Sequence, residues 1–254
     1  MIVTNIVICG SSGKMGKVIH NIISTREDCK VVAGIDKNTE DSTNFPVVST
    51  PNLLSSLSIE PDVIIDFSHP SVLDELPDYC LTNRVALVIA TTGYSKEEVE
   101  KIHQAAKEMP LFFTANMSLG VNLIAELAKK AVSVLGDQFD IEIVEKHHNQ
   151  KIDAPSGTAL MLADAINEEV DHQYSYTYDR QSVREKRTKK EIGLHAVRGG
   201  TIVGDHDIIF AGRDEVITLS HHAASKEVFA VGAVNAALFL KGKEPGLYNM
   251  KNLI

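Results

Sequence analysis

The chain has 254 residues, of which 44% are hydrophobic and 23% charged, a composition typical of a globular protein with one large or two ordinary domains. Its formal net charge of −9 and the lack of a basic stripe argue against nucleic-acid binding, and no window is apolar enough to span a membrane. The N-terminus lacks a basic signal-peptide start, so we expect a cytoplasmic protein without a membrane partner.

Three cysteines, Cys9, Cys29 and Cys80, are widely spaced and lie in apolar or helical surroundings. An odd number with this spacing favours reduced thiols over a disulfide or metal framework. We therefore expect all three to be packing residues.

The first predicted elements form a dinucleotide fingerprint. An apolar strand, Asn5 to Gly10, leads into the turn GSSGKMG, and a helical pattern runs from Lys17 to Thr25. The G-x-x-G-x-x-G spacing permits a tight turn and close approach of a pyrophosphate. A second strand, Lys30 to Ile35, ends at Asp36, an acid placed to bind the adenine ribose.

Lys37 leaves the choice of cofactor open. Its charge could accept the 2′-phosphate of NADPH, whereas Asp36 favours NADH, so we expect both to bind. The alternative is that these two residues form an ordinary solvated turn.

Strands and helices continue to alternate up to residue 114. The predicted strands are Pro61 to Phe67, Val85 to Ala90 and Leu111 to Thr114, and the predicted helices are Ser71 to Thr82 and Ser95 to Lys107. This order indicates a Rossmann-like, doubly wound parallel sheet. Ligands bind at the carboxyl ends of such strands, here Gly10 to Gly16, Asp36, Phe67 to His69, Thr91 to Gly93 and Ala115 to Met117.

A change of pattern after Asn116 predicts an inserted α+β domain with a mixed or antiparallel sheet. Its predicted elements are a helix over Leu119 to Leu135, an edge strand over Tyr174 to Arg180, and strands over Gly193 to Arg198, His206 to Ala211 and Glu215 to His221. The charge run Arg184 to Glu191 indicates a mobile, solvated loop. The apolar helix Val228 to Leu240 should pack on the first domain, giving domains 1–118 with 228–254, and 119–227.

The stretch EIVEKHHNQKIDAPSGT, residues 142–158, carries the strongest chemical signal. A half-buried strand from Phe139 to His147 precedes His148 and Lys151, and a helical pattern runs from Ala159 to Val170. The start of that helix, at Ser156, Gly157 and Thr158, has free N–H groups that can hold a carboxylate, with Ser156 as N-cap. A histidine beside this site can supply a proton near neutral pH.

Simpler interpretations of this stretch exist. A single strand-end histidine is usually a surface or core residue, and a PSGT segment is most often only a helix cap. A zinc site is disfavoured because His147 and His148 are adjacent on a strand and point to opposite faces.

These motifs closely resemble the 4-hydroxy-tetrahydrodipicolinate reductase (dihydrodipicolinate reductase) family of the diaminopimelate route to lysine. The stretch EIVEKHHNQKIDAPSGTA is similar to the family signature, and GSSGKMG, DFSHP, TTGYS, TANMSLGVN and HAVRGGTIVGDH also match. The resemblance covers essentially the whole chain. Lys14 and Lys37 stand where family members often carry arginine, and some members have arginine in place of His69.

The resemblance implies a role for each matching residue. His147 would be the general acid and Lys151 the cation at the reacting centre, while His148, Ser156, Gly157 and Thr158 would bind the substrate. The residues implied to bind the cofactor, NADPH or NADH, are Gly10, Ser12, Gly13, Lys14, Met15, Gly16, Asp36, Lys37, Phe67, Thr91, Gly93, Ala115, Asn116 and Met117. No metal is implied.

The resemblance also implies a homotetramer joined through the sheet of the second domain. We expect the imidazole and ammonium groups to face the nicotinamide across a gap that fits a small dicarboxylate substrate. Two alternatives remain open. One is a non-catalytic sensor of the cofactor that docks a protein partner, and the other is a reductase of another imino or keto acid.

Overall fold

The computed structural model describes residues 3–40 and 44–254. The chain divides into two compact units. Unit 1 comprises Met1–Leu119 and Glu227–Ile254, and unit 2 comprises Gly120–Lys226.

Unit 1 contains a seven-stranded sheet whose strands are all parallel, in the order β12-β6-β5-β4-β1-β2-β3. The strands are β1 (Thr4–Cys9), β2 (Cys29–Ile35), β3 (Val47–Val48), β4 (Val63–Asp66), β5 (Ala86–Ile89), β6 (Pro110–Phe113) and β12 (Gly246–Tyr248). Because β1 lies between β2 and β4, the strand order reverses there, and open parallel sheets bind ligands at this switch point. The Rossmann-like sheet is confirmed; β3 and β12 were not predicted.

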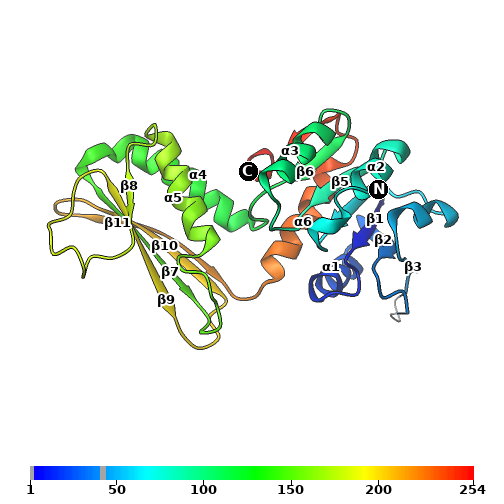
Figure 1. The fold of residues 1–254 in the computed structure, drawn as a ribbon, viewed down its shortest axis with the longest axis horizontal. Coiled ribbons are helices and arrows are strands. Elements are labelled where there is room, and N and C mark those ends of the chain that lie inside the picture. The colour runs from blue at the N-terminus through cyan, green and yellow to red at the C-terminus, as the bar shows by residue number, and fades with distance from the viewer. Residues whose placement is uncertain (1–2, 41–43) are drawn as a thin grey trace. The chain divides into compact units, whose positions relative to one another are not determined.

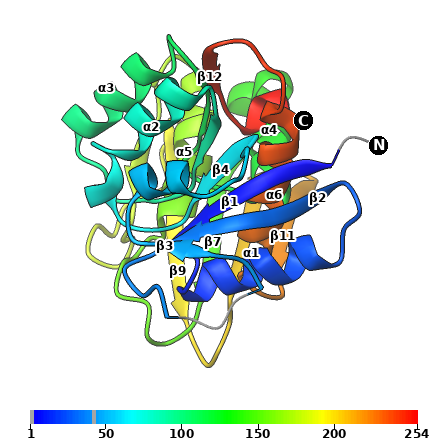
Figure 2. The ribbon, with the colours of Figure 1, turned by 90° about the vertical axis from the view of Figure 1, so that its right-hand side faces the viewer.

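Helices cover both faces of this sheet (Figure 2). The helices are α1 (Lys14–Ser24), α2 (Leu76–Asn83), α3 (Lys96–Ala105) and α6 (Glu227–Leu240), with short 3₁₀ turns at Pro51–Ser56, Pro70–Val72 and Met250–Asn252. One core packs α1 and α6 against the strands, and a second core packs α2 and α3. Cys9, Cys29 and Cys80 are buried free thiols in these cores, as expected.

The helix predicted from Ser71 to Thr82 is wrong in its first half. The chain forms a 3₁₀ turn at Pro70–Val72, and α2 begins only at Leu76. Pro77 lies in the first turn of α2, where a missing N–H costs nothing, whereas an earlier start would place its ring against a carbonyl within the helix.

Unit 2 contains a mixed five-stranded sheet in the order β11-β10-β7-β9-β8, covered on one face by α4 and α5 (Figure 1). The elements are α4 (Leu119–Leu135), a 3₁₀ turn at Gly136–Gln138, β7 (Asp140–His147), α5 (Gly157–Glu169), β8 (Ser175–Thr177), β9 (Glu191–Arg198), β10 (Gly204–Ala211) and β11 (Val216–Ala223). β10 runs antiparallel to β7 and β11, whereas β9 runs parallel to β7 and β8. The mixed sheet, the edge position of β8 and the bounds of α4 are as predicted.

The alternation along β7 decides which side chains reach the core. Ile141, Ile143, Glu145 and His147 are buried, while the residues between them are half-buried. Ile141 and Ile143 pack against α4 and α5, so the period of two places Glu145 and His147 on that helix-covered face. Glu142 lies on the opposite face.

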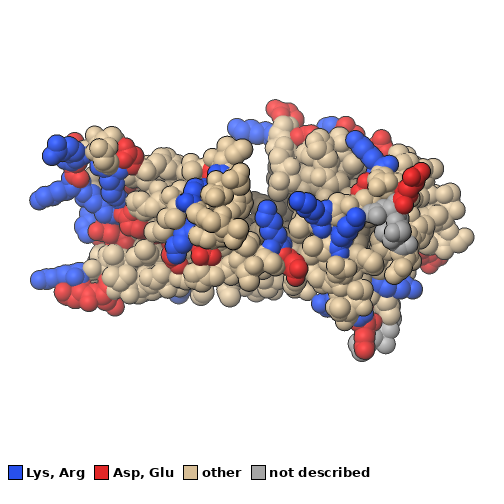
Figure 3. Space-filling model, turned by 90° about the horizontal axis from the view of Figure 1, so that it is seen from below, with Lys and Arg blue, Asp and Glu red and all other residues tan. Residues whose placement is uncertain are grey.

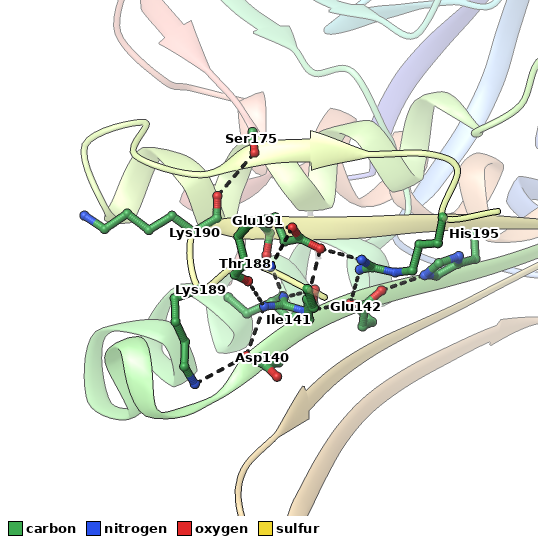
Figure 4. A network of polar contacts seen from close by, with 11 residues as sticks. Asp140, Ile141, Glu142, Ser175, Thr188, Lys189, Lys190, Glu191 and His195 are labelled. Atoms are coloured by element: carbon green, nitrogen blue, oxygen red, sulfur yellow. Dashed lines mark hydrogen bonds and ion pairs between the residues drawn. The ribbon is translucent and has the colours of Figure 1, made fainter. Parts of the chain in front are cut away.

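Most residues of the charge run Arg184 to Glu191 are exposed, as predicted, but the prediction of a solvated loop is wrong for Arg187 and Glu191 (Figure 4). The Arg187 side chain is only 18% exposed and donates to Glu142 and Asp140, at 3.0 Å each, and to the carbonyl of Glu191 at 2.7 Å. Burial alone would raise the pKa of Glu191, but hydrogen bonds from Thr188 and Arg180 lower it to about 2. The segment is thereby fixed to the open face of the sheet.

Surface charge in unit 2 is mixed in sign. At the left-hand end of Figure 3, which belongs to this unit, Lys and Arg side chains are interspersed with Asp and Glu. Within the described residues, no helix has the length and apolar character needed to cross a membrane.

Candidate active site

The glycine turn after β1 is built by close backbone packing. Gly10 has a φ of +84°, and a Cβ there would lie 2.6 Å from the carbonyl oxygen of Phe67. A Cβ on Gly16 would lie 2.2 Å from the carbonyl oxygen of Gly10. Neither position accepts a side chain, so the turn packs tightly between the end of β4 and α1.

The start of α1 has the character of an anion site. Its N-cap is Gly13, no side chain among the described residues caps it, and its first turn, which includes Lys14 and Met15, contains no acid. The unpaired N–H groups of this turn carry a partial positive charge. A pyrophosphate fits these groups well.

Asp36 lies directly after β2 and contacts the same turn. Its carboxylate accepts the backbone N–H groups of Ser12 and Asn38, both at 3.0 Å, and the Ser12 hydroxyl donates to the carbonyl of Asn38 at 3.0 Å. Lys37 is exposed beside it. The acid and the glycine turn therefore form one connected loop structure, as a ribose next to a pyrophosphate requires.

The loops after β4 and β5 are joined by a buried carboxylate that we did not predict as a site residue. Asp66, 1% exposed, accepts from the Ser68 backbone N–H at 3.1 Å and from the Ser68 hydroxyl. The Ser68 N–H also donates to the Thr91 hydroxyl at 2.9 Å. Burial raises the pKa of Asp66, and hydrogen bonds from Ser68 and Thr91 oppose that rise. Its only sequence signal was an acid at the end of an apolar strand.

The predicted cofactor residues of unit 1 all follow strands that end at the same edge of the sheet. Phe67 follows β4, Thr91 and Gly93 follow β5, and the segment Ala115 to Met117 follows β6. Thr91, Asn116 and Met117 are buried, whereas Gly93 and Ala115 are exposed. The carboxyl ends of parallel strands thus bring these residues together with the glycine turn.

In unit 2, His147 is the last residue of β7 and is held by Glu145. Its Nδ1 lies 2.6 Å from Glu145 Oε2. Glu145 is completely buried. It also accepts hydrogen bonds from both terminal nitrogens of Arg198, on β9, at 2.8 and 2.6 Å. Burial alone would raise the pKa of Glu145, but hydrogen bonds from Arg198 and His147 lower it below its ordinary value.

The start of α5 is capped as predicted. The Ser156 hydroxyl accepts the N–H of Ala159 at 3.1 Å, and the Ser156 N–H donates to Glu145 Oε1 at 3.0 Å. Gly157 is exposed, and the space around its missing Cβ is open. Thr158 is half-buried beside it. The start of α5 is therefore exposed at Gly157, whose backbone N–H donates to the Asp153 carboxylate.

Lys151 lies in the turn between β7 and α5. Its ammonium group pairs with Asp153 at 2.8 Å, and its side chain is 22% exposed. Its backbone N–H donates to the carbonyl of His148 at 3.2 Å. The hydrogen bond from Lys151 lowers the pKa of Asp153. The ammonium is thus held in the segment that joins His147 to the helix start.

His206 on β10 belongs to the same cluster, although the sequence gave it no assigned role. It is 3% exposed, its Nε2 lies 3.0 Å from the Ser156 hydroxyl, and its ring centroid lies 5.3 Å from that of His147. Burial, with the neighbouring His147, lowers the pKa of His206 to about 4. Only the pairing of β10 with β7, which places His206 opposite Glu145, reveals this contact.

In unit 1, a glycine turn lies at the switch point of the sheet. In unit 2, an imidazole, an ammonium group and the exposed start of a helix lie near one another. These features are typical of oxidoreductases that use nicotinamide dinucleotides. The class follows from the parallel sheet, because its strand ends supply the residues that such a cofactor needs.

Comparison with known proteins identifies the family. The family models described as dihydrodipicolinate reductase, N-terminus and C-terminus, match residues 4–117 and 120–254. The 4-hydroxy-tetrahydrodipicolinate reductase of Clostridium tetani is 50% identical over 98% of this chain and 96% of that protein, and that of Caldanaerobacter subterraneus is 52% identical over 98% and 97%. The solved structure of a dipicolinate-bound dihydrodipicolinate reductase from Paenisporosarcina sp. TG-14 is similar over 100% of both chains, with a TM-score of 0.82 and 27% identity. This chain belongs to the dihydrodipicolinate reductase family.

Proposed function

We propose that this chain reduces 4-hydroxy-tetrahydrodipicolinate to tetrahydrodipicolinate with NADPH or NADH, a step of the diaminopimelate route to lysine. Family membership supports the reaction class. The structural observation that carries the proposal is the placement of the His147 imidazole beside the open start of α5, with Lys151 in the connecting segment.

The cofactor would be held by the glycine turn and its neighbours. Backbone N–H groups at the start of α1 would bind the pyrophosphate, and Asp36 would accept hydrogen bonds from ribose hydroxyls. Lys14 and Lys37 would attract the 2′-phosphate of NADPH, and we therefore propose that both cofactors are used. When bound, the reduced nicotinamide supplies the hydride.

The substrate would be held by unit 2. Ser156, Gly157 and Thr158 would bind a carboxylate of the dianion at the start of α5, and His148 would border the pocket. The ring loses its 4-hydroxyl as water, takes up a hydride and takes up one proton. We assign that proton to Nε2 of His147, because Nδ1 is already bound to Glu145. The Lys151 ammonium would stabilise negative charge as it develops on the ring.

An assay with freshly generated 4-hydroxy-tetrahydrodipicolinate tests the proposal, with NADPH and NADH oxidation followed in parallel. Oxidation that depends on the substrate is the expected result. A non-catalytic sensor would bind both cofactors and oxidise neither. A panel of small imino and keto dicarboxylates run beside it would identify a reductase of another substrate, which would then be turned over faster.

We also propose a cytoplasmic homotetramer. Exposed apolar side chains on β11, Val216 at 64% and Ile217 at 37% exposure, offer unit 2 a surface for association. Sedimentation equilibrium measures this directly, and a mass equal to one chain would contradict the assembly.

A further inference from the structure

One carboxylate contacts both parts of the proposed substrate site. Glu145 Oε2 accepts hydrogen bonds from Nδ1 of His147 and Nη1 of Arg198. Oε1 accepts hydrogen bonds from Nη2 of Arg198 and from the backbone N–H of Ser156. Each oxygen thus has two donors, and the group is completely buried. A side chain that only filled space would not require this set of partners.

We propose that Glu145, neutralised by Arg198, is a positioning residue that holds the proton-donating imidazole and the carboxylate-binding helix start in one fixed arrangement. The proposal rests on the function proposed above and deepens it, because it assigns a role to a residue that contacts neither substrate nor cofactor.

Glu145 determines the tautomer of His147. An ionised carboxylate can only accept hydrogen bonds, so the nitrogen that faces it must carry the hydrogen. The pKa of Glu145 lies below its ordinary value, which keeps the group ionised near neutral pH. Nδ1 is therefore the protonated nitrogen, and Nε2 is the nitrogen that gains and loses the catalytic proton.

A glycine lies beside Nε2 of His147 and leaves room for access to that nitrogen. Gly204, the first residue of β10, lies next to this nitrogen, and a Cβ there would be 3.0 Å from it. The absence of a side chain at Gly204 leaves the nitrogen uncovered on that side. The same imidazole is thus anchored at one nitrogen and left open at the other, as a proton donor requires.

The cluster contains three further charged or titratable groups, Arg198, His206 and Lys151. From β9, Arg198 balances the charge of Glu145, and its Nη2 also donates to the carbonyl of Asp153 at 2.7 Å. From β10, His206 is kept neutral near pH 7 by burial, which lowers its pKa to about 4, so it adds no second cation beside His147. Lys151 is paired with Asp153 in the connecting segment. The fixed charges next to the imidazole are therefore the Glu145–Arg198 pair.

The chain offers a matched control on the same strand. Glu142 also accepts from a histidine at 2.6 Å, His195, and from two arginines, but it lies on the opposite face of β7 (Figure 4). Glu142→Gln therefore removes the same kind of charge from the same strand without touching the proposed site.

The experiment measures kcat, KM, cofactor affinity and the ¹⁵N chemical shifts of the His147 ring in the intact protein. Glu145→Gln should lower kcat by about 10- to 100-fold, the usual effect of losing a carboxylate that orients a functional imidazole, and should leave cofactor affinity unchanged. The Nδ1 signal should also lose its character as a carboxylate-bound N–H. Glu142→Gln should leave kcat and the His147 signals as in the wild type.

An unchanged kcat in Glu145→Gln, or an equal loss in Glu142→Gln, would overturn the positioning role. If Glu145→Gln does not fold, Glu145→Asp serves instead, because it keeps the charge and shortens the side chain. It should shift the same ring signals and lower kcat by a smaller factor. Unshifted ring signals would overturn the positioning role. If the wild type turns over no substrate, the function proposed above fails, yet the ring signals of His147 still test whether Glu145 fixes its tautomer.

Discussion

The two faces of β7 carry similar sets of residues. On the helix-covered face, Glu145 binds His147 and Arg198. On the open face, Glu142 binds His195 together with Arg180 and Arg187 of the β8–β9 segment. Both carboxylates lie 2.6 Å from an imidazole nitrogen. A hydrogen-bonded cluster of glutamate, arginine and histidine therefore does not by itself mark an active site.

The surroundings of the clusters distinguish them. Glu145 is fully buried and bonded to the start of a helix, whereas the Glu142 side chain is 21% exposed and fixes a surface segment. Gly204 leaves Nε2 of His147 open, whereas Gly193 makes room for the Glu142 carboxylate itself, since a Cβ there would lie 1.8 Å from its Oε2. One cluster leaves an imidazole nitrogen uncovered near the start of a helix, and the other holds a surface segment against the sheet.

The largest expected difference between the two faces is in kcat, when His147 and His195 are each replaced. His147→Gln should lower kcat by roughly 10²-fold or more, because positioned acid catalysis typically supplies that factor, while cofactor affinity stays at the wild-type level. His195→Gln should leave kcat unchanged. Steady-state kinetics with cofactor titration measures both, and near-normal turnover of His147→Gln would remove it from the acid role.

The second effect concerns stability on the open face. Arg187→Met removes the mostly buried guanidinium that pairs with Glu142 and lies near Glu191. The free energy of unfolding should therefore fall by about 2–3 kcal/mol, while kcat is retained. Urea unfolding measures the loss. Arg213→Met is the control, because Arg213 and Asp214 are 95% and 91% exposed and such a pair contributes little. Equal losses in the two variants would contradict a structural role for the Glu142 cluster.

The third effect is a dependence of stability on pH that arises on the helix-covered face. The pKa of His206 is lowered to about 4 in the folded protein, whereas its ordinary pKa is 6.5. As pH falls from 6.5 towards 4, the unfolded chain takes up a proton that the folded protein does not. The free energy of unfolding therefore decreases over this range. Between about pH 7 and pH 5 the contribution amounts to about 2 kcal/mol. His206→Gln should lose correspondingly less stability than the wild type over this interval in urea unfolding. An identical loss in both proteins would mean that His206 does not titrate in this way.

The smallest effect concerns substrate binding at the start of α5. Thr158→Val removes a hydroxyl while keeping the side-chain shape, so KM for the dicarboxylate should rise by about tenfold and kcat should change little. Thr177→Val on the edge strand β8 is the matched control and should have the wild-type KM. An unchanged KM in Thr158→Val would place the carboxylate elsewhere.

Much of unit 1 was predictable because its signals are local. The glycine spacing, the strand before it and Asp36 after the second strand determine a turn whose geometry depends on residues close in sequence. In unit 2, the strand of His147, the cap at Ser156 and the bounds of α4 also followed from local patterns.

The polar clusters of unit 2 were not predictable in this way. Arg198 lies 53 residues from Glu145, and Arg187 lies 45 residues from Glu142, so both pairs depend on strand register. Local composition showed only that residues 184–191 are charged. Which of those charges become buried depends on partners that the β7–β9 pairing brings into reach.

A crystal structure of the protein with dipicolinate, a stable planar dicarboxylate, and NADPH tests the central claim most directly. The account predicts a ligand carboxylate on the N–H groups of Gly157 and Thr158, with the ligand ring facing Nε2 of His147 within about 3–3.5 Å, the separation of groups poised to react. A dicarboxylate bound away from both the start of α5 and His147, for example beside His195 on the open face, would contradict it.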